Sequence, residues 1–164
     1  MPTPRPKPWN RGITESIRRR ESQKYTEQNG GQPLPALAFL HIPLPEYTQA
    51  WESFDTKRYG DRNEKECSPN INSGMFTQML ECGDVMGIFA GHDHVNDYIA
   101  TLYNIALGYG RASGGKNTYG DKTPGSRMIV LKEGKREFDT WLREKENTEK
   151  LNVCTYPDSF VKKK

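Results

Sequence analysis

The sequence is poor in cysteine, with three in 164 residues, at Cys67, Cys82 and Cys154. Their number is odd, they lie far apart, and they form no C-x-x-C pair. This excludes the cysteine pattern of a small disulfide-rich domain and of a thiolate zinc knuckle. We expect free thiols that are mostly structural, with a Cys67–Cys82 bridge as the alternative if the protein is exported.

Long apolar runs are missing as well. No stretch approaches the roughly 18 consecutive apolar residues of a transmembrane helix, so we expect no membrane span. The glycine-rich segment 108–125 lacks the G-x-x-x-x-G-K-[ST] pattern of a nucleotide-binding P-loop. Residues 1–24 hold seven Lys and Arg against two Glu, and residues 162–164 are all lysine. No binding motif accompanies these basic ends, so nucleic-acid binding is not favoured.

Short apolar runs alternate with polar or glycine-containing turns through the middle of the chain. The run 36–40 predicts a strand buried on both faces, and residues 75–80 have the apolar spacing of a helix. Further strands are expected at 85–90, 97–103 and 105–109, and a hairpin at 126–131 and 136–142. This alternation predicts a mixed α/β (α+β) fold, in which helices flank a mixed β-sheet.

Composition divides the chain into three parts. Residues 1–33 are a basic, proline-rich lead-in that ends in a helix over about 14–28, and residues 34–142 carry the predicted strands. Residues 143–164 are expected to be a charged tail. Within the middle part, residues 55–72 are almost wholly polar and predict a long exposed loop.

The chain has three histidines, His41, His92 and His94, and all of them follow predicted strands. A side chain directly after a buried strand points into the crevice beyond the strand ends, where open α/β sheets place their sites. Neutral imidazole is the commonest metal-binding side chain. A turn after Gly91 would aim His92 and His94 at two neighbouring points, which permits two metal ions. Although Gly-His-x-His is short enough to occur by chance, the three histidines are our candidate metal ligands.

These motifs, considered together, resemble the C-terminal half of the calcineurin-like metallophosphoesterases. His41-Ile42-Pro43 follows one apolar strand and Gly91-His92-Asp93-His94 follows the next. The segments 108–115, 125–130 and 138–141 look like the branch of that family related to purple acid phosphatases. The resemblance covers residues 34–142. It implies the second half of an αββα sandwich and a phosphatase or phosphodiesterase that uses two metal ions, commonly Fe, Mn or Zn, to activate a hydroxide toward a phosphoester.

The resemblance also assigns roles to individual residues. It makes His41 and His92 ligands of the second metal and His94 a ligand of the first, whereas Asp93 matches no ligand. Arg111, in the glycine-rich loop, is our candidate phosphate contact, with a solvated loop arginine as the alternative. The resemblance identifies no catalytic residue in this chain.

The family's other ligands lie in an Asp-x-His, a Gly-Asp and a Gly-Asn-His-[Asp/Glu] motif, and none of these occurs upstream of His41. Without the bridging aspartate, we expect the chain to be inactive or weak by itself. Three hypotheses stay open: the C-terminal part of a phosphoesterase, a module whose histidines hold one metal with Asp97 or Asp121 as a fourth ligand, and a non-catalytic interaction protein. Because the inner face of this half would pack on another half, we expect self-association or a missing N-terminal half as its partner.

Overall fold

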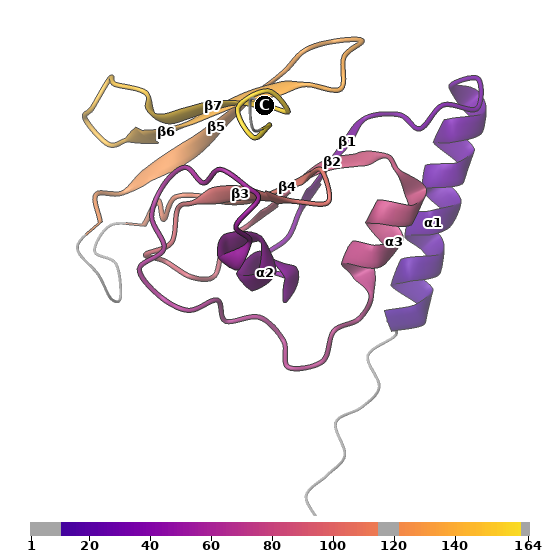
Figure 1. The fold of residues 1–164 in the computed structure, drawn as a ribbon, viewed down its shortest axis with the longest axis horizontal. Coiled ribbons are helices and arrows are strands. Elements are labelled where there is room, and N and C mark those ends of the chain that lie inside the picture. Colours follow the sequence, from indigo (N-terminus) through magenta and orange to yellow (C-terminus); the bar gives the residue numbers. More distant parts are fainter. Residues whose placement is uncertain (1–10, 115–121, 162–164) are drawn as a thin grey trace, which may run out of the picture.

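The computed structural model describes residues 11–114 and 122–161 of the chain. They form three layers, namely a three-stranded sheet, a four-stranded sheet and a layer of helices beneath it (Figure 1). The elements in order are α1 (Arg11–Gln28), β1 (Ala36–Phe39), α2 (Glu46–Glu52), α3 (Met75–Cys82), β2 (Val85–Ala90), β3 (Ile99–Leu102), β4 (Ile105–Tyr109), β5 (Gly125–Leu131), β6 (Phe138–Glu144) and β7 (Leu151–Tyr156). The predicted mixed α/β fold, in which helices flank a mixed β-sheet, is confirmed, and the structure adds a second sheet of three strands.

The first sheet has the strand order β1-β2-β4-β3. β2 pairs in parallel with both β1 and β4, and β3 returns antiparallel to β4. All six residues of β2 are buried, because one face of this sheet meets the helices and the other meets the second sheet. A sheet covered on both faces explains the continuous apolar sequence of β2.

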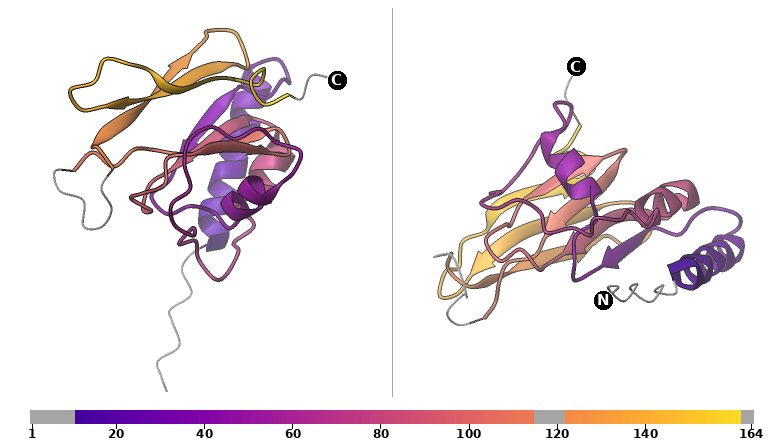
Figure 2. Two further views of the ribbon diagram at one scale, coloured as in Figure 1. Left: turned by 60° about the vertical axis from the view of Figure 1, so that its left-hand side comes forward. Right: turned by 90° about the horizontal axis from the view of Figure 1, so that it is seen from below.

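The second sheet, β5-β6-β7, is antiparallel and lies across the first (Figure 2). Its inward face carries Phe138, Thr140 and Leu142, which alternate with less buried residues along β6. Phe138 packs edge-on against Phe89 of the first sheet, with ring centroids 5.8 Å apart. Gly87 leaves room for this ring, because a Cβ atom there would lie 3.3 Å from Phe138. The two sheets therefore share one apolar core.

Two predictions about single elements are wrong. β1 is not buried on both faces, because it is an edge strand, and its last residue, Phe39, is 67% exposed. Residues 143–164 are not only a tail, since they supply β7, which pairs with β6 and buries Cys154 and Tyr156. Charged residues before and after β7 hide this strand in the sequence, and only its pairing with β6 shows it.

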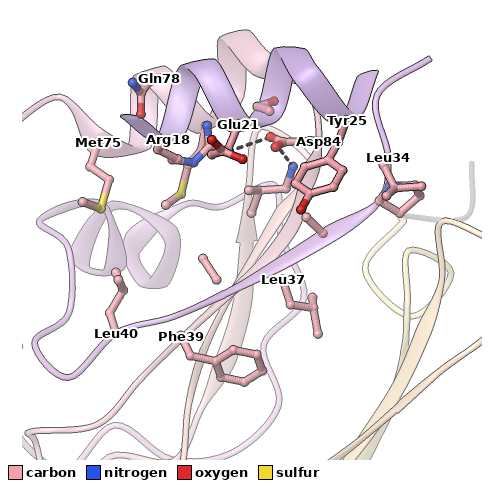
Figure 3. Close-up of a pocket in the computed structure, with 16 residues that line it drawn as sticks. Arg18, Glu21, Tyr25, Leu34, Leu37, Phe39, Leu40, Met75, Gln78 and Asp84 are labelled. Atoms are coloured by element: carbon pink, nitrogen blue, oxygen red, sulfur yellow. Dashed lines mark hydrogen bonds and ion pairs between the residues drawn. The ribbon is translucent and has the colours of Figure 1, made fainter. Parts of the chain in front are cut away.

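The outer side of β1 lines a hollow against α1 and α3 (Figure 3). Leu37, Phe39 and Leu40 line it from β1 and the residue that follows, and an ion pair between Arg18 and Asp84, 2.6 Å apart, ties α1 to the start of β2. Self-association, which we expect because the inner face of this half would pack on another half, stays a prediction. None of the helices in the described part of the chain is long and apolar enough to cross a membrane.

Candidate functional site

Two neighbouring parallel strands deliver two of the histidines to one place. β1 and β2 end side by side, and the chain beyond them stays paired: Leu40 donates its N–H to the Phe89 carbonyl at 2.9 Å, and Gly91 donates to the His41 carbonyl at 3.0 Å. The rings of His41 and His92 meet edge to face, with centroids 5.2 Å apart. The structure therefore brings together two imidazoles that lie far apart in the sequence.

An open cleft of about 380 Å³ lies at this edge of the sheet. It is lined by all three histidines, by Asp93, and by residues 110–114 that follow β4. The carboxyl ends of β1, β2 and β4 thus surround one cleft, as expected for an open sheet with parallel strands.

A strained turn sets the directions of His92 and Asp93. His92 has φ of +71°, and the Asp93 N–H donates to the Gly91 carbonyl at 2.8 Å across it. A three-residue turn with positive φ at its centre is a rare γ-turn, and such strain persists only where the surrounding structure over-determines it. The predicted turn after Gly91 is confirmed, and it separates the direction of His92 from that of its neighbours.

Asp93 points into the protein. Its carboxylate accepts the hydroxyl of Tyr109 at 2.5 Å and the backbone N–H of Cys67 at 3.2 Å and 3.3 Å. Burial, together with this bond to Asp93, raises the pKa of Tyr109 well above its ordinary value. Tyr109 therefore stays a protonated donor, and Asp93 is a firmly held carboxylate.

Arg111 also lines the cleft, but its guanidinium is already engaged. It donates to Asp97, to Glu144 at 2.6 Å and to the Thr123 carbonyl at 2.8 Å, and its side chain is 6% exposed. A phosphate at Arg111 would compete with these bonds, so the solvated-arginine alternative is wrong and the phosphate contact stays a prediction. Asp97 also accepts from Lys122 and from the Asp61 N–H, so a metal ion there would have to displace them. Asp121 lies outside the described residues.

Comparison with known proteins gives three relatives from Arabidopsis thaliana. "Probable inactive purple acid phosphatase 14" is 50% identical over 80 residues, which is 49% of this chain and 20% of the relative. "Probable inactive purple acid phosphatase 29" is 35% identical over 137 residues, or 81% of this chain and 33% of the relative. "Probable inactive purple acid phosphatase 28" is 37% identical over 109 residues, or 65% of this chain and 26% of the relative.

The chain is related to the C-terminal part of the purple acid phosphatases. It spans a third or less of the length of the relatives it matches. No family model and no solved structure matches the chain. The resemblance expected from the histidine motifs is confirmed, and the two-sheet fold is consistent with a metallophosphoesterase.

The described residues fit only part of the dinuclear centre that is usual in purple acid phosphatases. Three imidazoles line the cleft, and imidazole is a suitable ligand for Zn and Fe. Within residues 16–114 and 122–161, however, one group of three metal-binding side chains has all its ligand atoms within 4.8 Å of one another, and it is Cys67, His92 and Asp93. This group contains His92 but neither His41 nor His94. The roles of His41, His92 and His94 as metal ligands stay predictions.

Cys67 is the residue at this site that the sequence did not reveal. All three cysteines are free thiols in the structure, and Cys67 is exposed. Its loop was predicted to be exposed, but residues 59–67 are docked on the loop that follows His94. Asn63 and Glu64 donate their N–H groups to the Asn96 side chain at 2.8 Å and 3.0 Å, and Gly60, with φ of +92°, packs directly against Asp97. Since nothing in the local sequence marks this contact, only the fold places Cys67 beside His92.

Glu66 anchors the same loop and should make stability depend on pH. Burial by itself raises the pKa of Glu66, but hydrogen bonds from Arg62 and Tyr98 outweigh burial, and the net pKa is lowered. A lowered folded-state pKa adds stability above the unfolded-state pKa, and this stability is lost as the pH falls through the folded-state pKa. We expect the unfolding free energy of Glu66→Gln to decrease less steeply than that of the wild type as the pH falls below about 4. Urea unfolding at a series of pH values measures this dependence. Glu146→Gln, at an exposed carboxylate, is the control, and an unchanged slope in Glu66→Gln would contradict the prediction.

Proposed function

We propose that this chain supplies histidine metal ligands to a metal-dependent phosphoester hydrolase. By itself the chain hydrolyses phosphoesters weakly or not at all. The observation that supports the proposal is the meeting of His41 and His92, 5.2 Å between ring centroids, in a cleft that His94 also lines. The names of the three relatives, each of which includes "inactive", agree with a low activity.

In this proposal the chain's own residues bind the metal and orient its ligands. His41, His92 and His94 would bind Fe, Mn or Zn through their ring nitrogens, and a bound metal would supply a Lewis acid for the phosphoester oxygen. The paired ends of β1 and β2 fix the positions of His41 and His92. Tyr109 and the Cys67 backbone keep Asp93 in place, which holds the turn at His92 in its strained form. The natural phosphoester is not specified, because specificity resides in loops rather than in the fold.

A chimera tests this proposal. The chain replaces the corresponding C-terminal part of an active purple acid phosphatase, and hydrolysis of p-nitrophenyl phosphate is measured with Mn²⁺, Zn²⁺ and Fe. We expect activity from the chimera and little or none from the 164-residue chain. Loss of a residue that only orients a metal ligand typically lowers activity by roughly 10–100-fold. Since His92 is a proposed ligand itself, His92→Ala should lower the chimera's activity by more than this.

Leu131→Ala, on the second sheet and 59% exposed in the wild type, is the control and should keep the activity. A folded chimera without activity in any metal would contradict the hydrolase proposal. If the 164-residue chain were active and His92→Ala abolished this activity, the proposed low activity of the chain alone would be contradicted.

The second candidate is a non-catalytic metal-binding or interaction module that keeps this fold. The observation that favours it is the apolar edge at β1, where Phe39 is 67% exposed beside the hollow shown in Figure 3. A folded but inactive chimera would favour this candidate.

A further inference from the structure

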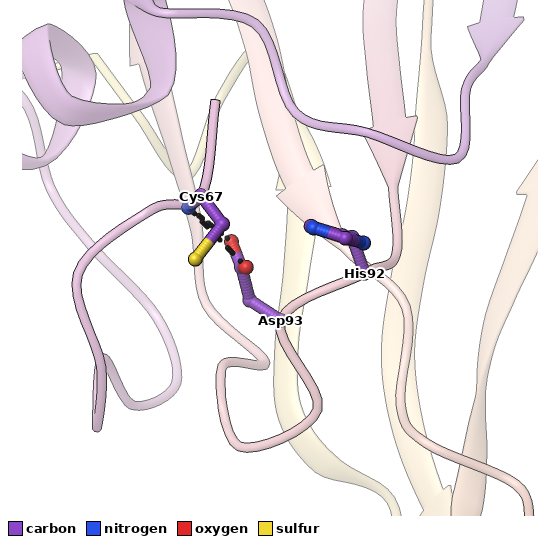
Figure 4. Close-up of side chains that lie close together, drawn as sticks. All are labelled: Cys67, His92 and Asp93. Carbon is purple, nitrogen blue, oxygen red and sulfur yellow. Dashed lines mark hydrogen bonds between the residues drawn. The ribbon is translucent and has the colours of Figure 1, made fainter. Parts of the chain in front are cut away.

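We propose that Cys67, His92 and Asp93 form a metal site for a single zinc ion, in which the Cys67 thiolate is a ligand. The sulfur of Cys67, a ring nitrogen of His92 and a carboxylate oxygen of Asp93 all lie within 4.8 Å of one another (Figure 4). This site shares His92 with the proposed hydrolase but does not depend on hydrolysis, on His94 or on a second metal ion.

Hydrogen bonds fix the backbone that leads to Cys67. Just before it, the Glu66 carboxylate accepts from Arg62 at 2.7 Å, from Thr48 at 2.8 Å and from Tyr98 at 2.7 Å. The Cys67 N–H itself bonds to Asp93. The backbone is therefore held near the other two ligands, whereas the exposed side chain can still rotate about its Cα–Cβ bond to meet a metal ion.

The distances fit a site that tightens when the ion binds. Zinc lies about 2.3 Å from sulfur and 2.0–2.2 Å from nitrogen and oxygen, so ligand atoms of a tetrahedral ion are roughly 3.3–3.6 Å apart. Contraction from separations of at most 4.8 Å to these values is a shift of roughly 1–1.5 Å, which side-chain rotations at the ligands can supply without a change of fold. Asp93 retains acceptor capacity, since a carboxylate has about four lone-pair sites and two donors, Tyr109 and the Cys67 N–H, use it here.

The ligand set suits zinc by charge and by type. A thiolate and a carboxylate together balance the charge of a divalent ion, and mixed sulfur, nitrogen and oxygen ligands are typical of zinc rather than of Mg²⁺ or Ca²⁺. The imidazole of His41, edge to face with His92, or a water molecule would complete four-coordination. Three ligands from the chain and one exchangeable position is the arrangement of zinc sites that stay open to a small molecule.

Cobalt(II) reports directly on the thiolate. We titrate the reduced 164-residue chain with Co²⁺ and record its near-ultraviolet absorption, where a cobalt-bound thiolate gives a charge-transfer band, and we then add Zn²⁺. We expect a band that saturates at one equivalent and is displaced by Zn²⁺. Cys67→Ser should abolish the band, and His92→Ala should weaken metal binding at least tenfold.

Cys82→Ser is the matched control, since Cys82 is also a free thiol, and it should keep the band. His94→Ala should keep it too. Absence of the band in the wild-type chain, or a band that survives Cys67→Ser, would overturn the proposal. Loss of the band in His94→Ala, with the fold retained by circular dichroism, would equally overturn it in favour of a site built on the three histidines. The outcome is independent of the chimera assay, because no activity is measured.

Discussion

Asp97→Asn is expected to lower the free energy of unfolding by about 3–5 kcal/mol, the usual cost of removing one partner from a buried ion pair. The Asp97 side chain is 2% exposed and pairs with both Arg111 and Lys122. Arg111 is itself buried, so the neutral amide would leave its guanidinium with Glu144 as the one carboxylate partner among residues 11–114 and 122–161. Urea unfolding at pH 7 measures the loss.

Asp61→Asn is the matched control for this prediction. Asp61 also pairs with Lys122, at 3.2 Å, but its side chain is 69% exposed. Exposed pairs contribute about 0–1 kcal/mol, so Asp61→Asn should be close to wild type. In the Asp97→Asn background, Arg111→Leu should cost less than it costs in the wild-type chain, because the two charges stabilise each other. Equal effects of Asp97→Asn and Asp61→Asn would contradict the central role of Asp97.

Phe138→Ala is expected to lower the free energy of unfolding by about 3–5 kcal/mol, the usual cost of truncating a fully buried phenylalanine. The ring is 0% exposed, stacks on Tyr156 with centroids 5.1 Å apart and packs against Phe89 of the other sheet. Its removal leaves a cavity where the two sheets meet, beside Gly87, which has no side chain to fill it. Chemical denaturation of the purified variant measures this effect.

Leu131→Ala gives a matched control, because Leu131 is the cross-strand partner of Phe138 in the β5–β6 pair but is 59% exposed. Leu131→Ala should lower the free energy of unfolding by about 0.5 kcal/mol, which is typical of surface substitutions. If both variants lost the same free energy, the β5–β6 pairing would matter and the packing between the sheets would not.

The sequence by itself predicted the elements whose apolar pattern is local. β2, β4, α3 and the β5–β6 hairpin are confirmed, because each has its own periodicity or turn signal within a few residues. The positions of His41 and His92 at strand ends were predictable for the same reason. The three histidines as candidate ligands came from the sequence, and the structure brings them to one cleft.

Contacts between distant segments were decided by the tertiary structure alone. Whether β1 lies inside a sheet or at its edge depends on which strands pair with it, and β7 exists as a strand because β6 offers it a partner. Arg111 has the sequence context of a solvated loop residue, yet the fold buries it between Asp97 and Glu144. Cys67 reaches His92 because its polar loop finds hydrogen-bond partners in Asp93, Asn96 and Tyr98. Local pattern determines which residues become strand or helix, whereas satisfying buried polar groups across the chain determines which residues meet.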